Sequence, residues 1–183
     1  MSYDLVVKDG TVIDGSGQPG YRADIGIKNG KIWSIGRITE PAKQEIDAEG
    51  HVVSPGFIDG HTHMDAQIFW DHLGSCSCYH GVTSVVMGNC GFTIAPCKEA
   101  DASYVFKNLE RAEDISPEAM KAGINWSWET FPEFLDTLDR LPKGINYAGY
   151  IGHSAMRTYV MGERAFTEKA DEDELKRMCE IAK

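Results

Sequence analysis

The sequence predicts an α/β fold, and two observations support this prediction. Before Pro55 the chain reads as short β segments separated by turns, whereas after Pro55 uncharged β segments alternate with amphipathic helical patterns. Buried parallel strands interleaved with helices are typical of an α/β sheet or barrel. We therefore predict a β-rich domain over residues 1–55 and an α/β domain over residues 56–183.

A β-hairpin is expected in the first domain. Residues 24–28 and 31–35 are two β-type segments, and Asn29-Gly30 separates them. Asn-Gly between two such runs is the strongest short-range hairpin signal.

The second domain is expected to contain three strands and at least three helices. The strands are predicted over residues 56–63, 83–88 and 148–152, and apolar periodicity predicts helices over residues 104–112 and 131–141. A last helix is predicted to begin at Asp171, because Glu174 follows three residues later in the pattern of a capping box.

Net charge, apolar run length and cysteine usage indicate which classes of partner and which compartment to expect. The formal net charge is −10, whereas nucleic acids and anionic membranes attract basic surfaces. Apolar runs all fall short of the roughly 18 residues that span a bilayer. Five cysteines without a CxxC pair, and an N-terminus unlike a secretory signal, favour reduced thiols. We therefore expect a cytoplasmic protein with neither nucleic acid nor membrane as a partner.

The most informative run is Pro-Gly-Phe-Ile-Asp-Gly-His-Thr-His, which ends an expected strand. Side chains alternate across a strand, so His61 and His63 project from the same face. Two such imidazoles can reach one metal ion, and zinc accepts imidazole nitrogens at about 2.0–2.1 Å. Without further context, two histidines at this spacing more often have a structural role.

A second run delivers a cysteine at the end of another apolar strand. It reads Gly-Val-Thr-Ser-Val-Val-Met-Gly-Asn-Cys-Gly-Phe, with the thiol at Cys90. The flanking glycines allow close approach of the backbone. A thiolate is a soft ligand that favours zinc over magnesium or calcium, although a lone cysteine is usually a small buried hydrophobic residue.

Together these runs resemble a known family. Residues 54–63 resemble the signature of the amidohydrolase superfamily, and Gly-Asn-Cys-Gly at residues 88–91 resembles a motif of D-aminoacylases and N-acyl-D-glutamate deacylases. Residues 150–157, Tyr-Ile-Gly-His-Ser-Ala-Met-Arg, are similar to a Val-Gly-His-x-x-x-Arg stretch of the same enzymes. The resemblance extends through nearly the whole chain, so the chain is identified as the N-terminal portion of an N-acyl-D-amino-acid deacylase.

The resemblance implies a specific architecture. Residues 1–55 would form part of a small β-sandwich, and residues 56–183 the first three strand–helix units of a metal-dependent (β/α)8 (TIM) barrel. Active sites of such barrels lie at the C-terminal ends of the strands. A complete barrel takes about 250 residues, so the barrel is expected to be incomplete in this chain.

The resemblance also implies a site and a reaction. His61, His63 and Cys90 would bind zinc, with one or two ions in the complete enzyme, and the substrate would be a small N-acyl-D-amino acid. His153 and Asp65 are candidates for the substrate pocket or for orienting a ligand. Alternatively, His153 is a buried structural histidine with satisfied hydrogen bonds, and Asp65 is a helix cap. The family's remaining histidine ligands and its catalytic aspartate would lie beyond this chain, so we expect the chain alone to be inactive.

Two other functional classes compete with this prediction. Cyclic-amide hydrolases of the dihydropyrimidinase or hydantoinase kind share the two histidines, but they usually use a carboxylated lysine, which the Cys90 motif argues against. Alternatively, the chain is a non-catalytic module that only binds metal or self-associates through exposed barrel edges.

Overall fold

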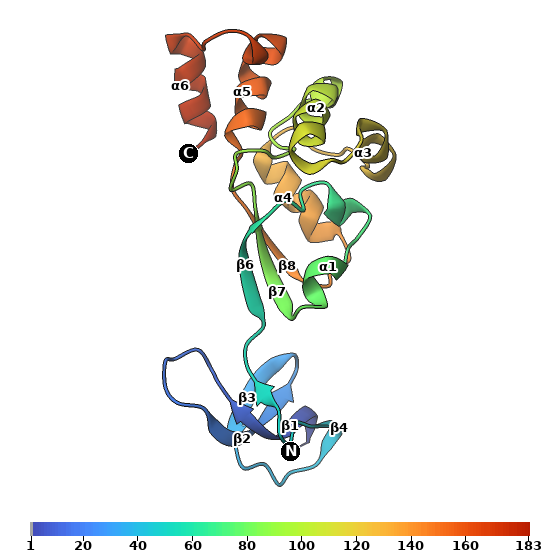
Figure 1. The fold of residues 1–183 in the computed structure, drawn as a ribbon, viewed down its shortest axis with the longest axis vertical. Helices are drawn as coiled ribbons and strands as arrows, with labels where there is room; N and C mark the ends of the chain where they lie inside the picture. Colours follow the sequence, from blue (N-terminus) through green and yellow to red (C-terminus); the bar gives the residue numbers. More distant parts are fainter. Residues whose placement is uncertain (1) are drawn as a thin grey trace. The chain divides into compact units, whose positions relative to one another are not determined.

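A computed structural model describes residues 2–183, and the chain divides into two compact units. One unit ends at Pro55, and the other runs from Gly56 to Lys183. The first unit is built of strands, whereas in the second unit strands alternate with helices (Figure 1). The prediction of a mixed α/β chain is confirmed.

The first unit is one mixed sheet in which β1 is central. Its strands are β1 (Tyr3–Val12), β2 (Tyr21–Lys28), β3 (Lys31–Gly36), β4 (Ala42–Asp47) and β5 (Val52–Val53). The order is β3-β2-β1-β4, and β5 also pairs with β1. β2 is antiparallel to both β1 and β3, whereas β4 and β5 run parallel to β1.

The expected hairpin joins β2 to β3. Lys28 pairs with Lys31, which leaves Asn29 and Gly30 as a two-residue turn. Their φ angles are +53° and +70°, and two positive φ values are what a type I′ turn requires. The hairpin prediction is confirmed.

The second unit contains a parallel sheet of three strands, β6 (Phe57–Thr62), β7 (Val82–Met87) and β8 (Asn146–Gly149), in that order. Thr62 pairs with Met87, and Met87 pairs with Gly149, so the three strands end at the same edge. The prediction that the third strand covers residues 148–152 is wrong in its bounds. The strand ends earlier because Gly152 is already the N-cap of a helix.

Helices fill the connections between these strands and follow the last one. In chain order they are η1 (Gln67–Phe69), α1 (Ser75–Cys78), η2 (Glu99–Asp101), α2 (Ala102–Glu113), α3 (Pro117–Gly123), α4 (Phe131–Arg140), α5 (His153–Met161), η3 (Gly162–Phe166) and α6 (Glu172–Ile181). α2 and α4 are the two helices expected from periodicity. α6 begins with the expected capping box, in which Asp171 and Glu174 accept each other's backbone N–H at 2.8 and 3.0 Å.

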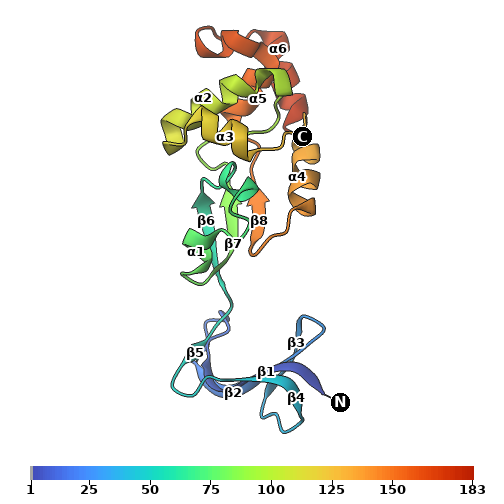
Figure 2. The ribbon, with the colours of Figure 1, turned by 90° about the vertical axis from the view of Figure 1, so that its right-hand side faces the viewer.

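The core of the second unit lies between β7 and the helices. Val85 and Met87, two residues apart on β7, are 0% and 1% exposed, as alternation on a strand predicts. They pack with Phe134 of α4 and with Trp128, whose ring nitrogen donates to the Ile94 carbonyl at 3.0 Å. In two perpendicular views, the strands point toward α2 and α5 (Figure 2). Within the described residues, every helix is too short or too polar to cross a bilayer.

Candidate metal centre

The two histidines lie at the carboxyl end of β6. Thr62, between them, is 7% exposed and its hydroxyl donates to the Val86 carbonyl at 3.0 Å. This contact holds β6 against β7. Because strand side chains alternate, His61 and His63 are turned to the face opposite Thr62.

Cys90 lies in the loop that follows β7, and two backbone features hold that loop. Gly88 and Gly91 have φ angles of +85° and +80°, which side-chain-bearing residues rarely adopt. A Cβ atom on Gly88 would lie 2.6 Å from the Tyr150 carbonyl oxygen, so the loop also passes close to the chain after β8. The two glycines of the Gly-Asn-Cys-Gly run are therefore suited to this turn for conformational reasons.

Hydrogen bonds tie the same loop to its neighbours on both sides. The Asn89 side-chain amide donates to the Gly60 carbonyl of β6. The Gly91 carbonyl accepts from the Ser154 backbone N–H at 2.9 Å and from its hydroxyl at 2.5 Å, at the start of α5. The residues on either side of Cys90 are thus hydrogen-bonded to β6 and to α5, and these contacts fix the position of Cys90.

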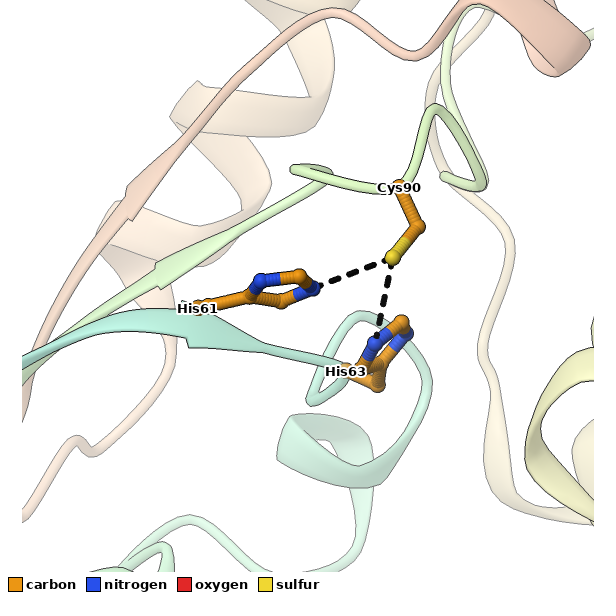
Figure 3. A group of neighbouring side chains, drawn as sticks. All are labelled: His61, His63 and Cys90. Atoms are coloured by element: carbon orange, nitrogen blue, oxygen red, sulfur yellow. Dashed lines mark hydrogen bonds between the residues drawn. The ribbon is translucent and has the colours of Figure 1, made fainter.

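The sulfur of Cys90 faces both imidazoles, and the three side chains form a triangle (Figure 3). Its Sγ is 3.0 Å from His61 Nε2 and 3.7 Å from His63 Nε2. All three ligand atoms lie within 4.8 Å of one another, and theirs is the one group of this kind among residues 2–183. The sequence predicted that these three residues share a site, and the fold brings them together.

The geometry of the three donors fits a tetrahedral zinc ion. Zinc–sulfur and zinc–nitrogen bonds of about 2.3 and 2.0–2.1 Å place tetrahedral sulfur and nitrogen ligands about 3.6 Å apart. The distance from Cys90 Sγ to His63 Nε2 matches this separation. The distance to His61 Nε2 is shorter, and lengthening it by roughly half an ångström requires only side-chain rotation of two exposed residues. Two imidazoles and a thiolate are also donors that zinc prefers.

A glutamate outside the recognised motifs also contacts this site. The carboxylate Oε1 of Glu113, the last residue of α2, makes an ion-pair contact with His63 Nδ1, and the glutamate side chain is 11% exposed. Among the described residues, Oε1 has no polar partner other than this ring nitrogen. Burial raises the pKa of Glu113, and His63 partly opposes this rise. One sequence feature could have pointed to Glu113: it is an acidic residue at the C-terminal end of a predicted helix, where the helix dipole disfavours negative charge.

Asp65 and His153 occupy different surroundings. Asp65 is 3% exposed, and burial raises its pKa to about 7, with a smaller rise from the charge of Glu113. His153 is exposed and begins α5, where its Cβ lies 3.7 Å from the place that a Cβ on Gly91 would take. Neither belongs to the group of three ligand atoms. Their assignment to the pocket or to orienting a ligand stays a prediction.

Thiol accessibility gives a direct prediction about the site. Cys90 is exposed, whereas Cys97 is 1% exposed and its pKa is raised to about 12 by burial and by the charges of Asp101 and Glu129. The thiolate is the reactive form, so iodoacetamide at about pH 8 should label Cys90 and spare Cys97. Added zinc should slow labelling of Cys90 by at least ~10-fold and leave the exposed Cys179 unchanged, as measured by peptide mass spectrometry. Equal labelling of Cys90 with and without zinc would contradict the site.

Two family models and a curated relative match this chain. The model of the amidohydrolase family matches residues 44–183, and the model of the urease alpha-subunit N-terminal domain matches residues 1–57. A D-aminoacylase of Alcaligenes xylosoxydans xylosoxydans is 35% identical over 181 residues, which cover 98% of this chain and 35% of that protein.

Two solved structures resemble the chain along almost all of its length. A D-aminoacylase studied for its binuclear metal centre has a TM-score of 0.79 and 34% identity, covering 98% of this chain and 35% of its own. An N-acyl-D-glutamate deacylase from Bordetella bronchiseptica, complexed with zinc and a phosphonate inhibitor, has a TM-score of 0.77 and 28% identity, covering 99% and 35%. This chain therefore spans about 35% of the length of these relatives. Since the family model matches well over half of the chain, the protein belongs to the amidohydrolase superfamily and corresponds to an N-terminal portion of its D-aminoacylase-like members.

Proposed function

We propose that this chain is part of a zinc-dependent deacylase that hydrolyses the amide bond of N-acyl-D-amino acids. The observation that carries the proposal is the convergence of His61, His63 and Cys90 at the carboxyl ends of two adjacent parallel strands. The same end of the strands carries the active site in TIM barrels. Relatives whose names denote deacylation of D-amino acids match almost the full length of the chain, which supports the substrate class.

In this proposal each side chain has a defined task. The Nε2 atoms of His61 and His63 and the thiolate of Cys90 hold the metal. The ion would lower the pKa of a water molecule toward about 7 and polarise the carbonyl of the substrate amide. Thr62 and Asn89 fix the strand and the loop that carry these ligands, so that the donors are held in place before the ion arrives.

The proposal extends to the architecture of the complete enzyme. β6, β7 and β8 with their helices would be the first three units of a (β/α)8 barrel, and the sheet of residues up to 55 would be one part of a β-sandwich. A barrel of this type takes about 250 residues, and further ligands and the proton-transferring acid would come from its later strands. We therefore expect the 183 residues by themselves to be inactive.

Exposed apolar side chains on β6 support the alternative that the isolated chain self-associates. Phe57 and Ile58 of β6 are 63% and 73% exposed, and within the described residues β6 pairs on one side only. Such an edge favours pairing with a further strand, which a longer chain or a second copy could supply. This alternative concerns the isolated chain and is compatible with deacylation by a complete barrel.

A chimera tests the proposed function. The matching N-terminal segment of a D-aminoacylase is replaced by these 183 residues, and hydrolysis of N-acetyl-D-amino acids is followed with and without zinc. We expect zinc-dependent turnover of the D-isomers, a decrease of at least ~100-fold in the chimera with Cys90→Ala, and no turnover by the isolated chain. Turnover of hydantoin but not of N-acetyl-D-amino acids would instead support the cyclic-amide hydrolase, and turnover by the isolated, mass-verified chain would refute the expected inactivity.

A further inference from the structure

The two ring nitrogens of His63 have different neighbours, and Glu113 is the neighbour of one of them. The carboxylate of Glu113 lies against Nδ1, while Nε2 faces Cys90 Sγ at 3.7 Å. A neutral imidazole carries its hydrogen on one nitrogen and a lone pair on the other. A carboxylate beside Nδ1 favours the hydrogen there, which leaves the lone pair of Nε2 directed at the candidate metal position.

We infer that Glu113 is a positioning residue for the metal site, which fixes both the tautomer and the orientation of the His63 ring. The inference rests on the proposed metal-binding function. Carboxylates that accept from the second nitrogen of a metal-binding histidine are a general device for this purpose. Here the carboxylate belongs to the last residue of α2, so the contact with His63 connects the end of that helix to the metal site.

The placement of Glu113 is difficult to explain without such a role. α2 is anchored to the core by Val105, Phe106 and Leu109, which are 1%, 7% and 2% exposed. Glu113 lies one turn after Leu109, on the same side of the helix, and its side chain is therefore carried inward. A buried carboxylate is costly, and the negative end of the helix dipole adds to that cost. The contact with His63 offsets both costs.

Glu110 provides a matched comparison on the same helix. It also lies in the last turn of α2, but its side chain is exposed. Removing Glu110 changes the charge of this helix end as much as removing Glu113 does, while the contact with His63 stays intact. Any effect specific to Glu113 therefore reports the contact and not the charge of the helix end.

The test uses the 183-residue chain and two measurements. Long-range ¹H–¹⁵N NMR of the metal-free chain, at a pH where the imidazole is neutral, reports which ring nitrogen of His63 carries hydrogen. Competition with a chromogenic chelator gives the zinc affinity. For the wild type we expect hydrogen on Nδ1. In Glu113→Ala we expect a mixture of tautomers and a zinc affinity lower by about 10–100-fold.

Two further variants separate positioning from a general loss of structure. Glu113→Gln keeps a side-chain oxygen that can accept from Nδ1–H, so it should retain the tautomer and lose less than about 10-fold in zinc affinity. Glu110→Ala should match the wild type in both measurements.

Three outcomes would overturn the inference. One is a Glu113→Ala chain with wild-type tautomer and a zinc affinity within about twofold of the wild type. A second is equal loss of affinity in Glu110→Ala. The third is hydrogen on Nε2 of His63 in the metal-free wild type, which decides the question even if a variant fails to fold. If the wild type binds no zinc at all, the proposed metal site fails, whereas the tautomer measurement still decides the role of Glu113.

Discussion

Replacing Cys90 with alanine is expected to lower the zinc affinity of the chain by more than about 100-fold. Cys90 Sγ lies 3.0 and 3.7 Å from the two imidazole nitrogens, so its loss removes one of the three donors and leaves only His61 and His63. Loss of a partner that only orients a ligand costs about 10–100-fold in metal affinity, and loss of a direct ligand should exceed that. Chelator competition measures the effect.

Cys179→Ala is the matched control for this prediction. Cys179 is also an exposed thiol, but it lies on α6 and outside the group of ligand atoms. Its replacement should leave the zinc affinity unchanged. A Cys90→Ala chain that binds zinc as tightly as the Cys179→Ala chain would show that the thiolate is not a ligand.

Replacing Gly88 with alanine is expected to destabilise the second unit by about 3 kcal/mol and to disrupt the metal site with it. The φ angle of +85° is strained for alanine. The new methyl group would also lie 2.6 Å from the Tyr150 carbonyl oxygen and 2.8 Å from Thr93 Cγ2. Because the first of these atoms is backbone, the loop that carries Cys90 must move. Chemical denaturation gives the free energy of unfolding, and zinc binding reports the site.

Gly81→Ala separates the contribution of the φ angle from that of the steric clash. Gly81 has a φ angle of +79°, but a Cβ there would meet only the Phe57 ring, at 3.5 Å. We expect this variant to lose about 1 kcal/mol and to keep its zinc affinity. Equal destabilisation of the two variants would contradict the role assigned to the close approach at Gly88.

The candidate site could be predicted largely because strand geometry is local. Alternation that continues just past the end of β6 sets His61 and His63 on one face, and parallel pairing of β6 with β7 aligns the two strand ends. Together with the resemblance carried by the Gly-Asn-Cys-Gly run, this pattern was enough to predict that Cys90 shares a site with the two histidines. The hairpin at Asn29-Gly30 was predictable for a similar reason, since its turn is determined by two adjacent residues.

Features that depend on distant parts of the chain could not be predicted in this way. Glu113 contacts a histidine fifty residues earlier in the sequence, and no periodic pattern connects the two positions. The parallel pairing of β4 with β1 joins segments separated by two other strands, and β4 carries little apolar signal because it is mostly exposed. β8 was placed too late because the Gly152 N-cap that ends the extended segment has no side chain to mark it.

The central claim is that His61, His63 and Cys90 bind zinc together. Zinc K-edge X-ray absorption of the zinc-loaded, mass-verified chain tests it most directly. The claim predicts one sulfur ligand at about 2.3 Å and nitrogen ligands at about 2.0–2.1 Å. A spectrum with oxygen and nitrogen ligands but no sulfur, or a chain that takes up no zinc after reconstitution, would contradict it.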